Sequence, residues 1–247
     1  MSRIEFRDVC VTFPVFSIKA RSIKNSSLSL LRGGKIVQKE KGLQVKALEG
    51  ISFECNDGDR VGIVGKNGSG KTTLLRCIQG IYEPTSGVSI VSGRIGSLID
   101  ITLGMEAELT GRENIFLRSK FLGLSNTEVR KSLDQIVSFS ELENFIDFPI
   151  RTYSSGMLLR LAFSVVTAFN FDIILMDEWL TVGDQGFSRK AEERLKSMLT
   201  NSRILVVATH SETLLRAICN RAILLDSGTI VCDDSPEEVA NRVSLEF

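Results

Sequence analysis

The most informative part of the sequence is a glycine-rich segment at positions 65–72, which reads Gly-Lys-Asn-Gly-Ser-Gly-Lys-Thr. It follows a short apolar run, Arg60–Val64, and precedes a stretch with helical character, Thr72–Gly80. Glycines let the backbone approach phosphate oxygens closely, and the positive end of the following helix adds to the attraction. With a lysine and a hydroxyl at its end, and a strand and a helix around it, the segment predicts a phosphate-binding loop rather than an ordinary turn.

This loop predicts binding of a nucleoside triphosphate with Mg²⁺. Lys71 is expected to reach the β- and γ-phosphates, and the Thr72 hydroxyl is expected to ligate Mg²⁺. The predicted nucleotide-binding residues of this segment are Gly65, Lys66, Asn67, Gly68, Ser69, Gly70, Lys71, Thr72 and Thr73.

Two adjacent carboxylates follow a second apolar run, Ile173–Met176. In a parallel sheet the carboxyl ends of the strands share one edge, where ligands of such folds bind. Asp177 is suited to bind Mg²⁺, and Glu178 is suited to act as a general base that polarises the attacking water. Two acids after a strand are often only surface residues; the phosphate loop makes the catalytic interpretation the stronger one.

His210 is the only histidine in the chain, and it follows another buried strand, Ile204–Ala208. A single histidine is usually a solvated or structural residue. Because the end of this strand belongs to the same sheet edge, a sensor of the γ-phosphate is the favoured interpretation of His210.

The remaining sequence predicts an α/β fold with a mostly parallel sheet. Strand-like runs, among them Ile95–Ile99, alternate with helical stretches, among them Lys190–Leu199. This alternation is typical of a parallel sheet covered on both faces. Between Thr110 and Phe169 the period is helical, with Ser125 before Glu128 as a predicted helix cap, so a helical lobe is expected within one domain. Ile4–Val9 and Val45–Phe53 each alternate like a half-buried strand, and a hairpin is expected through Ser227-Gly228. Antiparallel elements are therefore expected beside the parallel core.

Residues 17–46 form a predicted basic insertion, with eight Lys or Arg and one acid, Glu40. It is either a solvated surface loop or a segment that lies near an anionic membrane or a partner subunit.

Composition excludes several classes of protein. Thirty basic residues balance thirty acidic ones, which argues against a nucleic-acid partner, and 43% hydrophobic residues is ordinary for a globular protein. The longest apolar stretch, 158–176, is interrupted by charged and polar residues, so no membrane span is expected. Five scattered cysteines favour buried thiols in a reducing compartment over disulfides or a zinc site.

The ordered motifs resemble the ATP-binding cassette of ABC transporters over nearly the whole chain. Tyr153-Ser154-Ser155-Gly156-Met157 stands where that family has its signature, ahead of an apolar helix. The resemblance implies ATP hydrolysis in a head-to-tail homodimer, in which Ser154, Ser155 and Gly156 complete the partner's nucleotide site. It also implies that His210 is the switch histidine and that Asp184 crosses the dimer interface. The expected domain is 1–247, with a core of about 1–98 and 166–247 and a helical subdomain of about 99–165.

The details resemble the exporters of bacterial polysaccharides, particularly O-antigen exporters without a C-terminal carbohydrate-binding domain. They include Leu109–Asn114, Arg160–Phe163 and Val182–Asp184 with Phe187. The resemblance implies a separate transmembrane permease, held near 99–109, that handles the polysaccharide while this subunit stays on the cytoplasmic face of the inner membrane. Capsule or teichoic acid export is the alternative. A soluble ABC ATPase and a catalytically silent interaction module are the alternatives from other classes.

Some positions depart from the family pattern. Ser155 and Met157 replace a glycine and a glutamine of the signature. No glutamine stands at the expected glutamine loop, and Asp100 is the candidate substitute, either as a Mg²⁺ or water ligand or as an ordinary strand-end acid. Phe13, or else Phe16, is the candidate aromatic that stacks on adenine, and packing in the core is the alternative for both.

Overall fold

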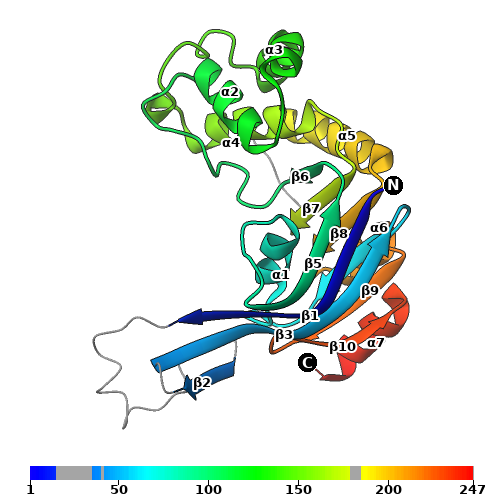
Figure 1. Ribbon diagram of the computed structural model, residues 1–247. Helices are drawn as coiled ribbons and strands as arrows, with labels where there is room; N and C mark the ends of the chain where they lie inside the picture. Colours follow the sequence, from blue (N-terminus) through cyan, green and yellow to red (C-terminus); the bar gives the residue numbers. More distant parts are fainter. Residues whose placement is uncertain (15–34, 40–41, 179–184, 247) are drawn as a thin grey trace. The chain divides into compact units, whose positions relative to one another are not determined.

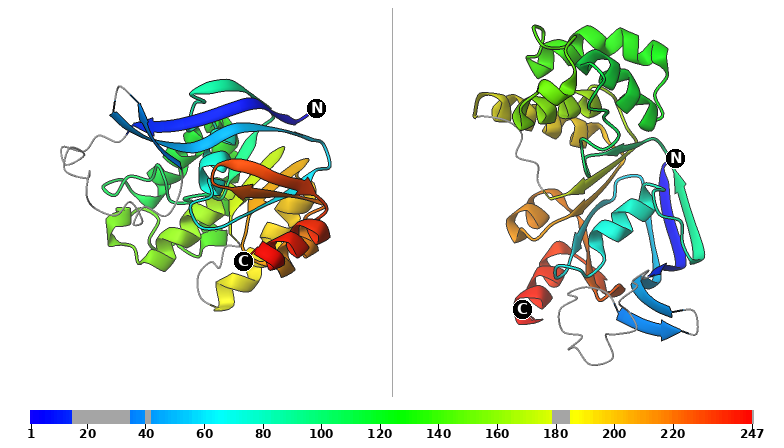
Figure 2. Two further views of the ribbon diagram at one scale, coloured as in Figure 1. Left: turned by 90° about the horizontal axis from the view of Figure 1, so that it is seen from below. Right: turned by 90° about the vertical axis from the view of Figure 1, so that its left-hand side faces the viewer.

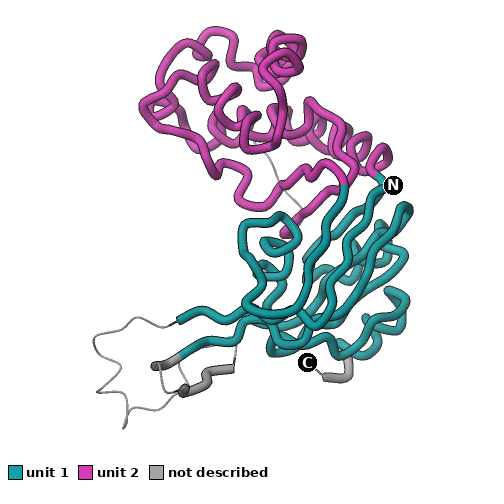
Figure 3. The backbone as a smooth tube through the Cα atoms, in the orientation of Figure 1, with its two compact units in different colours: residues 1–92, 203–247 teal, residues 93–202 magenta. Residues whose placement is uncertain are grey.

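The computed structural model describes residues 1–14, 35–39, 42–178 and 185–246, and the chain divides into two compact units. Unit 1 comprises Met1–Ser92 and Arg203–Phe247, and unit 2 comprises Gly93–Ser202. Figure 3 shows unit 1 in teal and unit 2 in magenta. Unit 2 is therefore inserted into the sequence of unit 1. Of the predicted basic insertion, residues 17–34 and 40–41 lie outside the described residues.

The first sheet of unit 1 is antiparallel and has the order β2-β3-β1-β5. Its strands are β1 (Arg3–Pro14), β2 (Lys35–Lys39), β3 (Gly42–Asn56) and β5 (Ser86–Ser92). β1 and β3 run side by side, with Ile4 opposite Cys55 and Phe6 opposite Phe53 (Figure 1). These four side chains are buried, and the two phenylalanine rings lie 5.1 Å apart. The alternation that predicts the two strands therefore reflects one face of the sheet that is turned to the core.

The second sheet of unit 1 carries the phosphate-loop strand between two parallel neighbours. β4 (Arg60–Val64) pairs in parallel with β8 (Ile204–Ala208) and with β9 (Arg221–Asp226), and β10 (Thr229–Asp234) pairs antiparallel with β9. Every residue of β8 is buried, as expected for a strand covered on both faces. Ser227 and Gly228, both with positive φ, form the predicted hairpin turn, which is confirmed.

Three helices accompany this sheet: α1 (Lys71–Ile78), α6 (Glu212–Ile218) and α7 (Pro236–Glu246). Val64, Leu215, Leu224 and Val239 form one apolar cluster that joins β4 and β9 to α6 and α7. Figure 2 shows α7, in red, beside β9 and β10 in both views. This packing fixes the carboxyl end of β4 against the C-terminal helix.

Unit 2 contains one parallel strand pair, β6 (Ile95–Ser97) with β7 (Ile173–Asp177), and mostly helices otherwise. The helices are α2 (Gly111–Phe121), α3 (Asn126–Ser140), the short 3₁₀ turn η4 (Ile150–Thr152), α4 (Ser155–Thr167) and α5 (Gln185–Asn201). Ser125 caps α3 in a capping box with Glu128, as predicted, and Thr110 with Glu113 does the same for α2.

The predicted α/β fold with antiparallel elements and an inserted helical part is confirmed. One strand is shorter than the sequence predicts: the apolar run at 95–99 continues past β6, which ends at Ser97. The chain turns away at Asp100, whose φ of 44° is left-handed, and the Ser97 hydroxyl accepts a hydrogen bond from the Ile99 N–H at 3.3 Å. Among the described residues, no helix combines the length and the apolar character that crossing a membrane requires.

Candidate nucleotide site

The phosphate loop of unit 1 runs from the end of β4 to the start of α1, as its sequence predicts. Gly65 is buried and has a φ of 149°. A Cβ at this position would lie 2.1 Å from the Leu225 carbonyl oxygen and 2.7 Å from the Ser69 Oγ. The loop is therefore packed so closely against β9 that only glycine fits at its first position.

Lys71 is held across this loop. Its side chain is 8% exposed, and its ammonium donates to the carbonyl oxygens of Gly65 at 2.7 Å and of Lys66 at 3.0 Å. These two oxygens keep a buried cation directly over the backbone of the loop. Thr72 and Thr73 lie in the first turn of α1, at its positive end.

Ser69 supplies the clearest test of whether the loop fits an anion. Its hydroxyl is buried and has no hydrogen-bond partner among the residues that the structure describes. The Ser69 backbone is meanwhile fixed from both sides, because its N–H donates to the Lys66 carbonyl and its carbonyl accepts from the Gly228 N–H at 2.8 Å. A rigid donor without an acceptor, next to a buried ammonium and a helix start, fits a phosphate group.

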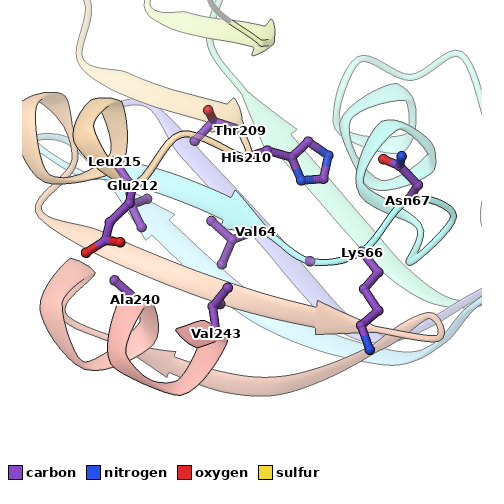
Figure 4. Close-up of a pocket in the computed structure, with 10 residues that line it drawn as sticks. Val64, Lys66, Asn67, Thr209, His210, Glu212, Leu215, Ala240 and Val243 are labelled. Carbon is purple, nitrogen blue, oxygen red and sulfur yellow. The ribbon is translucent and has the colours of Figure 1, made fainter. Parts of the chain in front are cut away.

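A cavity of about 340 Å³ adjoins the loop in unit 1. It is lined by Val64, Gly65, Lys66, Asn67, Thr209, His210, Glu212, Leu215, Ala240 and Val243. Figure 4 shows the His210 ring turned toward the side of the cavity where Asn67 lies, while Glu212 comes from α6. The structure thus places the histidine beside the first residues of the phosphate loop.

The backbone before His210 is firmly held. Thr209 is fully buried, its N–H donates to the Ile63 carbonyl at 3.1 Å, and its hydroxyl accepts from the Ser211 N–H at 3.0 Å. His210 itself is exposed. An exposed imidazole on a fixed backbone suits a group that contacts a bound ligand.

Phe13 lies at the end of β1 and contacts a second aromatic residue. Its ring centroid is 5.1 Å from that of Tyr82, in an edge-on arrangement of 72°. Arg76 donates to the Tyr82 hydroxyl at 3.2 Å and lies over the Tyr82 ring. Sequence reasoning missed Tyr82 and Arg76, although an aromatic residue just after α1 was a usable signal. Phe16 lies outside the described residues.

The predicted catalytic carboxylates belong to unit 2. β7 is buried from Ile173 to Met176 and ends at the half-buried Asp177, and Glu178 is exposed directly after it. Glu178 has a φ of 68°, a left-handed conformation that is uncommon for a residue other than glycine. Asp100 is also exposed and left-handed, and its carbonyl accepts from the Leu103 N–H. Asp184 lies outside the described residues.

The signature residues form the start of α4. Ser154 is the N-cap, and its hydroxyl accepts from the Met157 N–H at 3.2 Å. Tyr153 anchors this start, because its hydroxyl donates to the Phe145 carbonyl at 2.7 Å, and burial raises the pKa of that hydroxyl. Ser155 is exposed. Apart from the chain neighbours of Gly156 and the backbone of α4, the only described atom within 4 Å of a Cβ placed on Gly156 would be the Ser154 Oγ, at 3.9 Å.

A phosphate loop after a buried parallel strand, with a histidine beside it, is typical of a P-loop nucleoside triphosphatase. A family model described as ABC transporter matches residues 48–181, and the chain belongs to this family. It is an ATPase of the ABC class that binds and hydrolyses ATP.

Individual relatives match over most of the chain. It is 38% identical to the O-antigen export system ATP-binding protein RfbE of Yersinia enterocolitica, covering 93% of this chain and 97% of that protein. It is 39% identical to the teichoic acids export ATP-binding protein TagH of Lactococcus lactis, covering 90% of this chain and 47% of that protein. A dimeric ATP-binding cassette, MJ0796, solved with ADP and Pi, has the same fold, with a TM-score of 0.66, 23% identity, and coverage of 94% of this chain and 98% of that one.

Proposed function

We propose that this chain is the ATP-hydrolysing motor subunit of a bacterial system that exports lipid-linked polysaccharide, most specifically O-antigen, across the inner membrane. The phosphate loop is the observation that carries the ATPase part, because it holds the buried Lys71 ammonium and a Ser69 hydroxyl that has no hydrogen-bond partner among the described residues. The match to an O-antigen export protein over nearly the full length of both chains supports the cargo.

In this proposal the residues Gly65–Thr73 hold the triphosphate of ATP through their N–H groups, and Phe13 contacts the adenine. Lys71 exchanges the carbonyl oxygens that it now contacts for the β- and γ-phosphate oxygens, which offer the same ammonium full negative charges. His210 contacts the γ-phosphate from the neighbouring strand end.

Asp177 and the Thr72 hydroxyl, with Asp100 as a further ligand, are the groups that we assign to Mg²⁺. When bound, the ion neutralises charge on the phosphate oxygens. Carboxylate and hydroxyl oxygens are suitable ligands for it. The donor set of this chain therefore fits the ion that the family implies.

We assign Glu178 as the general base. A carboxylate takes a proton from the attacking water most effectively when its position is fixed. The left-handed backbone of Glu178 costs of order 1–3 kcal/mol, so it sets the direction of this side chain at the expense of stability. Such strain is common at catalytic positions.

The active form in this proposal is a head-to-tail homodimer. Ser154, Ser155 and Gly156 of each subunit face the γ-phosphate held by the other, at the positive start of α4, and Asp184 crosses between subunits. ATP binding closes the two subunits and hydrolysis releases them, to the extent that ATP binds the closed state more tightly. The motion acts on a separate transmembrane permease through residues 99–109, so the chain works at the cytoplasmic face of the membrane.

A deletion strain tests the proposal. Without the chain, lipid-linked polysaccharide should accumulate on the cytosolic face of the inner membrane and disappear from the cell surface. Expression of the parent chain should restore export, whereas Glu178→Gln, at equal abundance, should not. Normal surface polysaccharide in the deletion strain would contradict the export function, and restoration by Glu178→Gln would contradict the role of Glu178.

A further inference from the structure

Tyr82 lies shortly after α1 and contacts the end of β1. Its ring centroid is 5.1 Å from that of Phe13, and the two ring planes are inclined at 72°. Both rings are half-buried, so the pair lies at the surface of unit 1 rather than in its core. When two rings meet edge-on, the ring that contributes its edge keeps both of its faces free of the other ring. The contact can therefore orient an aromatic ring and still leave a face for a ligand.

Tyr82 is held in place by Arg76, in the last turn of α1. The Arg76 guanidinium donates to the Tyr82 hydroxyl at 3.2 Å, and its central carbon lies 5.9 Å from the Tyr82 ring centroid. The Arg76 carbonyl also accepts a hydrogen bond from the Tyr82 N–H at 3.3 Å. One residue of the helix thus contacts the backbone, the ring and the hydroxyl of Tyr82, so the ring is fixed relative to α1.

The end of β1, which carries Phe13, is bonded to the same segment. The Thr12 N–H donates to the Thr85 hydroxyl at 2.9 Å, and the Thr85 N–H donates to the Cys10 carbonyl at 2.7 Å. These hydrogen bonds hold the backbone before Phe13 beside the residues that follow Tyr82. The aromatic contact acts on the side chain of Phe13 instead, which the backbone bonds leave free to change its rotamer.

The orientation of the Phe13 ring matters for stacking. A side chain that is ordered only when a ligand binds loses rotamer entropy at that moment, and this loss weakens binding. The contact with Tyr82 orders the ring before any ligand arrives. The same helix also reaches the phosphates, because α1 begins at Lys71 and carries Arg76 in its last turn. The phosphate loop and the base of Tyr82 are therefore attached to opposite ends of one helix.

We propose that Tyr82 is a positioning residue of the adenine site, which holds the Phe13 ring in the orientation that stacks on the base. This proposal rests on the proposed function, in which Phe13 contacts the adenine of ATP, and it adds the residue that makes this contact effective. Tyr82 acts through Phe13 and does not contact the phosphates. Its loss should therefore weaken the binding of ligands that contain the base, and of no others.

The test compares two ligands in the variant Tyr82→Leu. The affinity for a non-hydrolysable ATP analogue with an unmodified adenine should fall about fivefold, which is the size of one aromatic contact. The affinity for Mg²⁺-tripolyphosphate, which has no base, should stay at the parent value. In steady-state assays the KM for ATP should rise by the same factor while kcat stays within about twofold of the parent. Titration calorimetry measures the two affinities, and unchanged tripolyphosphate binding shows that the variant is folded.

Two further variants control for bulk and position. Tyr82→Phe keeps the ring and loses the hydroxyl, so it should retain most of the affinity for the ATP analogue. Ile81→Ala changes a neighbouring side chain that is 44% exposed, and it should bind both ligands like the parent.

A double variant tests whether Tyr82 acts through Phe13. Phe13→Ala alone should weaken binding of the ATP analogue, and adding Tyr82→Leu should weaken it no further, since the ring to be positioned is gone. If Phe13→Ala binds the analogue like the parent, the adenine contact of the proposed function is wrong, and the role of Tyr82 fails with it. If Phe13→Ala binds weakly while Tyr82→Leu binds like the parent, or if the two losses add in the double variant, the adenine contact stands and the role of Tyr82 is wrong. An equal loss of tripolyphosphate affinity in Tyr82→Leu would also overturn that role.

Discussion

The predicted ATP site contains two glycines, Gly65 in unit 1 and Gly156 in unit 2. They differ in the space that the structure leaves for a side chain at each position. A Cβ on Gly65 would collide with the Leu225 carbonyl oxygen at 2.1 Å, so the packing of the chain itself demands a glycine. Outside the backbone of α4 and its chain neighbours, a Cβ on Gly156 would meet only the Ser154 Oγ among the described residues, at 3.9 Å. The phosphate loop is therefore built by internal packing, whereas the described residues of the subunit leave room for a side chain at Gly156. A nucleotide site that is shared between two subunits requires both features, a loop fixed within one subunit and a free surface on the other.

The largest effect should follow from Glu178→Gln, which removes the proposed base and keeps the shape of the side chain. Turnover should fall by about 10²–10⁴-fold while ATP binding persists, because the amide cannot accept the proton of the attacking water. Phosphate release measures turnover, and light scattering should show an ATP-bound dimer. Hydrolysis at the parent rate would show that Glu178 is not the general base. It would also remove the catalytic role that is proposed for unit 2.

Gly65→Ala tests whether the packing of the subunit requires a glycine at this position. The added methyl group must displace the backbone of β9, so the free energy of unfolding should fall by about 2–4 kcal/mol, or roughly 5–15 °C in Tm. Thermal unfolding without nucleotide is the measurement. A variant as stable as the parent would show that the loop is not held by internal packing.

Gly156→Ala is the matched change in the signature. Alanine favours the first turn of α4, so the stability of the isolated subunit should stay within about 0.5 kcal/mol of the parent or rise. Turnover should nevertheless fall at least about tenfold, because the methyl group occupies the surface offered to the other subunit's nucleotide. If activity and stability both remain at parent values, this surface does not take part in catalysis.

Ser69→Ala tests the proposed phosphate contact of the loop in unit 1. The hydroxyl is buried without a partner among the described residues, so its removal should leave the nucleotide-free protein equally stable or stabilise it. The affinity for ATP should fall about tenfold, because a hydrogen bond to a charged phosphate is lost. Equilibrium binding of a fluorescent ATP analogue measures this change, and unchanged affinity would remove Ser69 from the site.

The local parts of this structure are predictable from the sequence, because neighbouring residues determine them. The phosphate loop, the Ser125 cap and the Ser227-Gly228 turn each depend on a few consecutive positions with a defined backbone chemistry. The start of α5 shows the limit: the sequence predicts a helix from Lys190, but the helix begins at Gln185, since Gly186 weakens the signal in its first turn.

Features that depend on distant contacts could not be predicted in this way. The contact between Phe13 and Tyr82 joins the end of β1 to the residue that follows α1 by four positions, and no local pattern connects them. The burial of Arg118 in α2 is also tertiary, because an arginine in a helix is usually exposed. Hypotheses about the function of such residues therefore require the structure.

The smallest expected effect distinguishes a serine that only caps a helix from a serine that also contributes to turnover. Ser154 and Ser125 both cap a helix, so either change to alanine should cost about 1 kcal/mol of stability, measured as a fall in Tm. Only Ser154→Ala should also lower turnover beyond the effect of that destabilisation. Equal activity of the two variants would mean that Ser154 is a cap and nothing more.

Acid should distinguish the same two caps by stability alone. Glu128 accepts hydrogen bonds from the Ser125 hydroxyl and N–H, which lower its pKa to about 2, whereas Ser154 has Met157 at the corresponding position. Because the pKa of Glu128 is lower in the folded state than in the unfolded chain, its stabilisation is complete above about pH 4.5 and is lost as the pH falls toward 2. The Tm deficit of Ser125→Ala should therefore shrink between pH 5 and pH 3, while that of Ser154→Ala stays constant. A Ser125→Ala deficit that does not change over this range would show that the capping box of α3 does not stabilise the ionised glutamate.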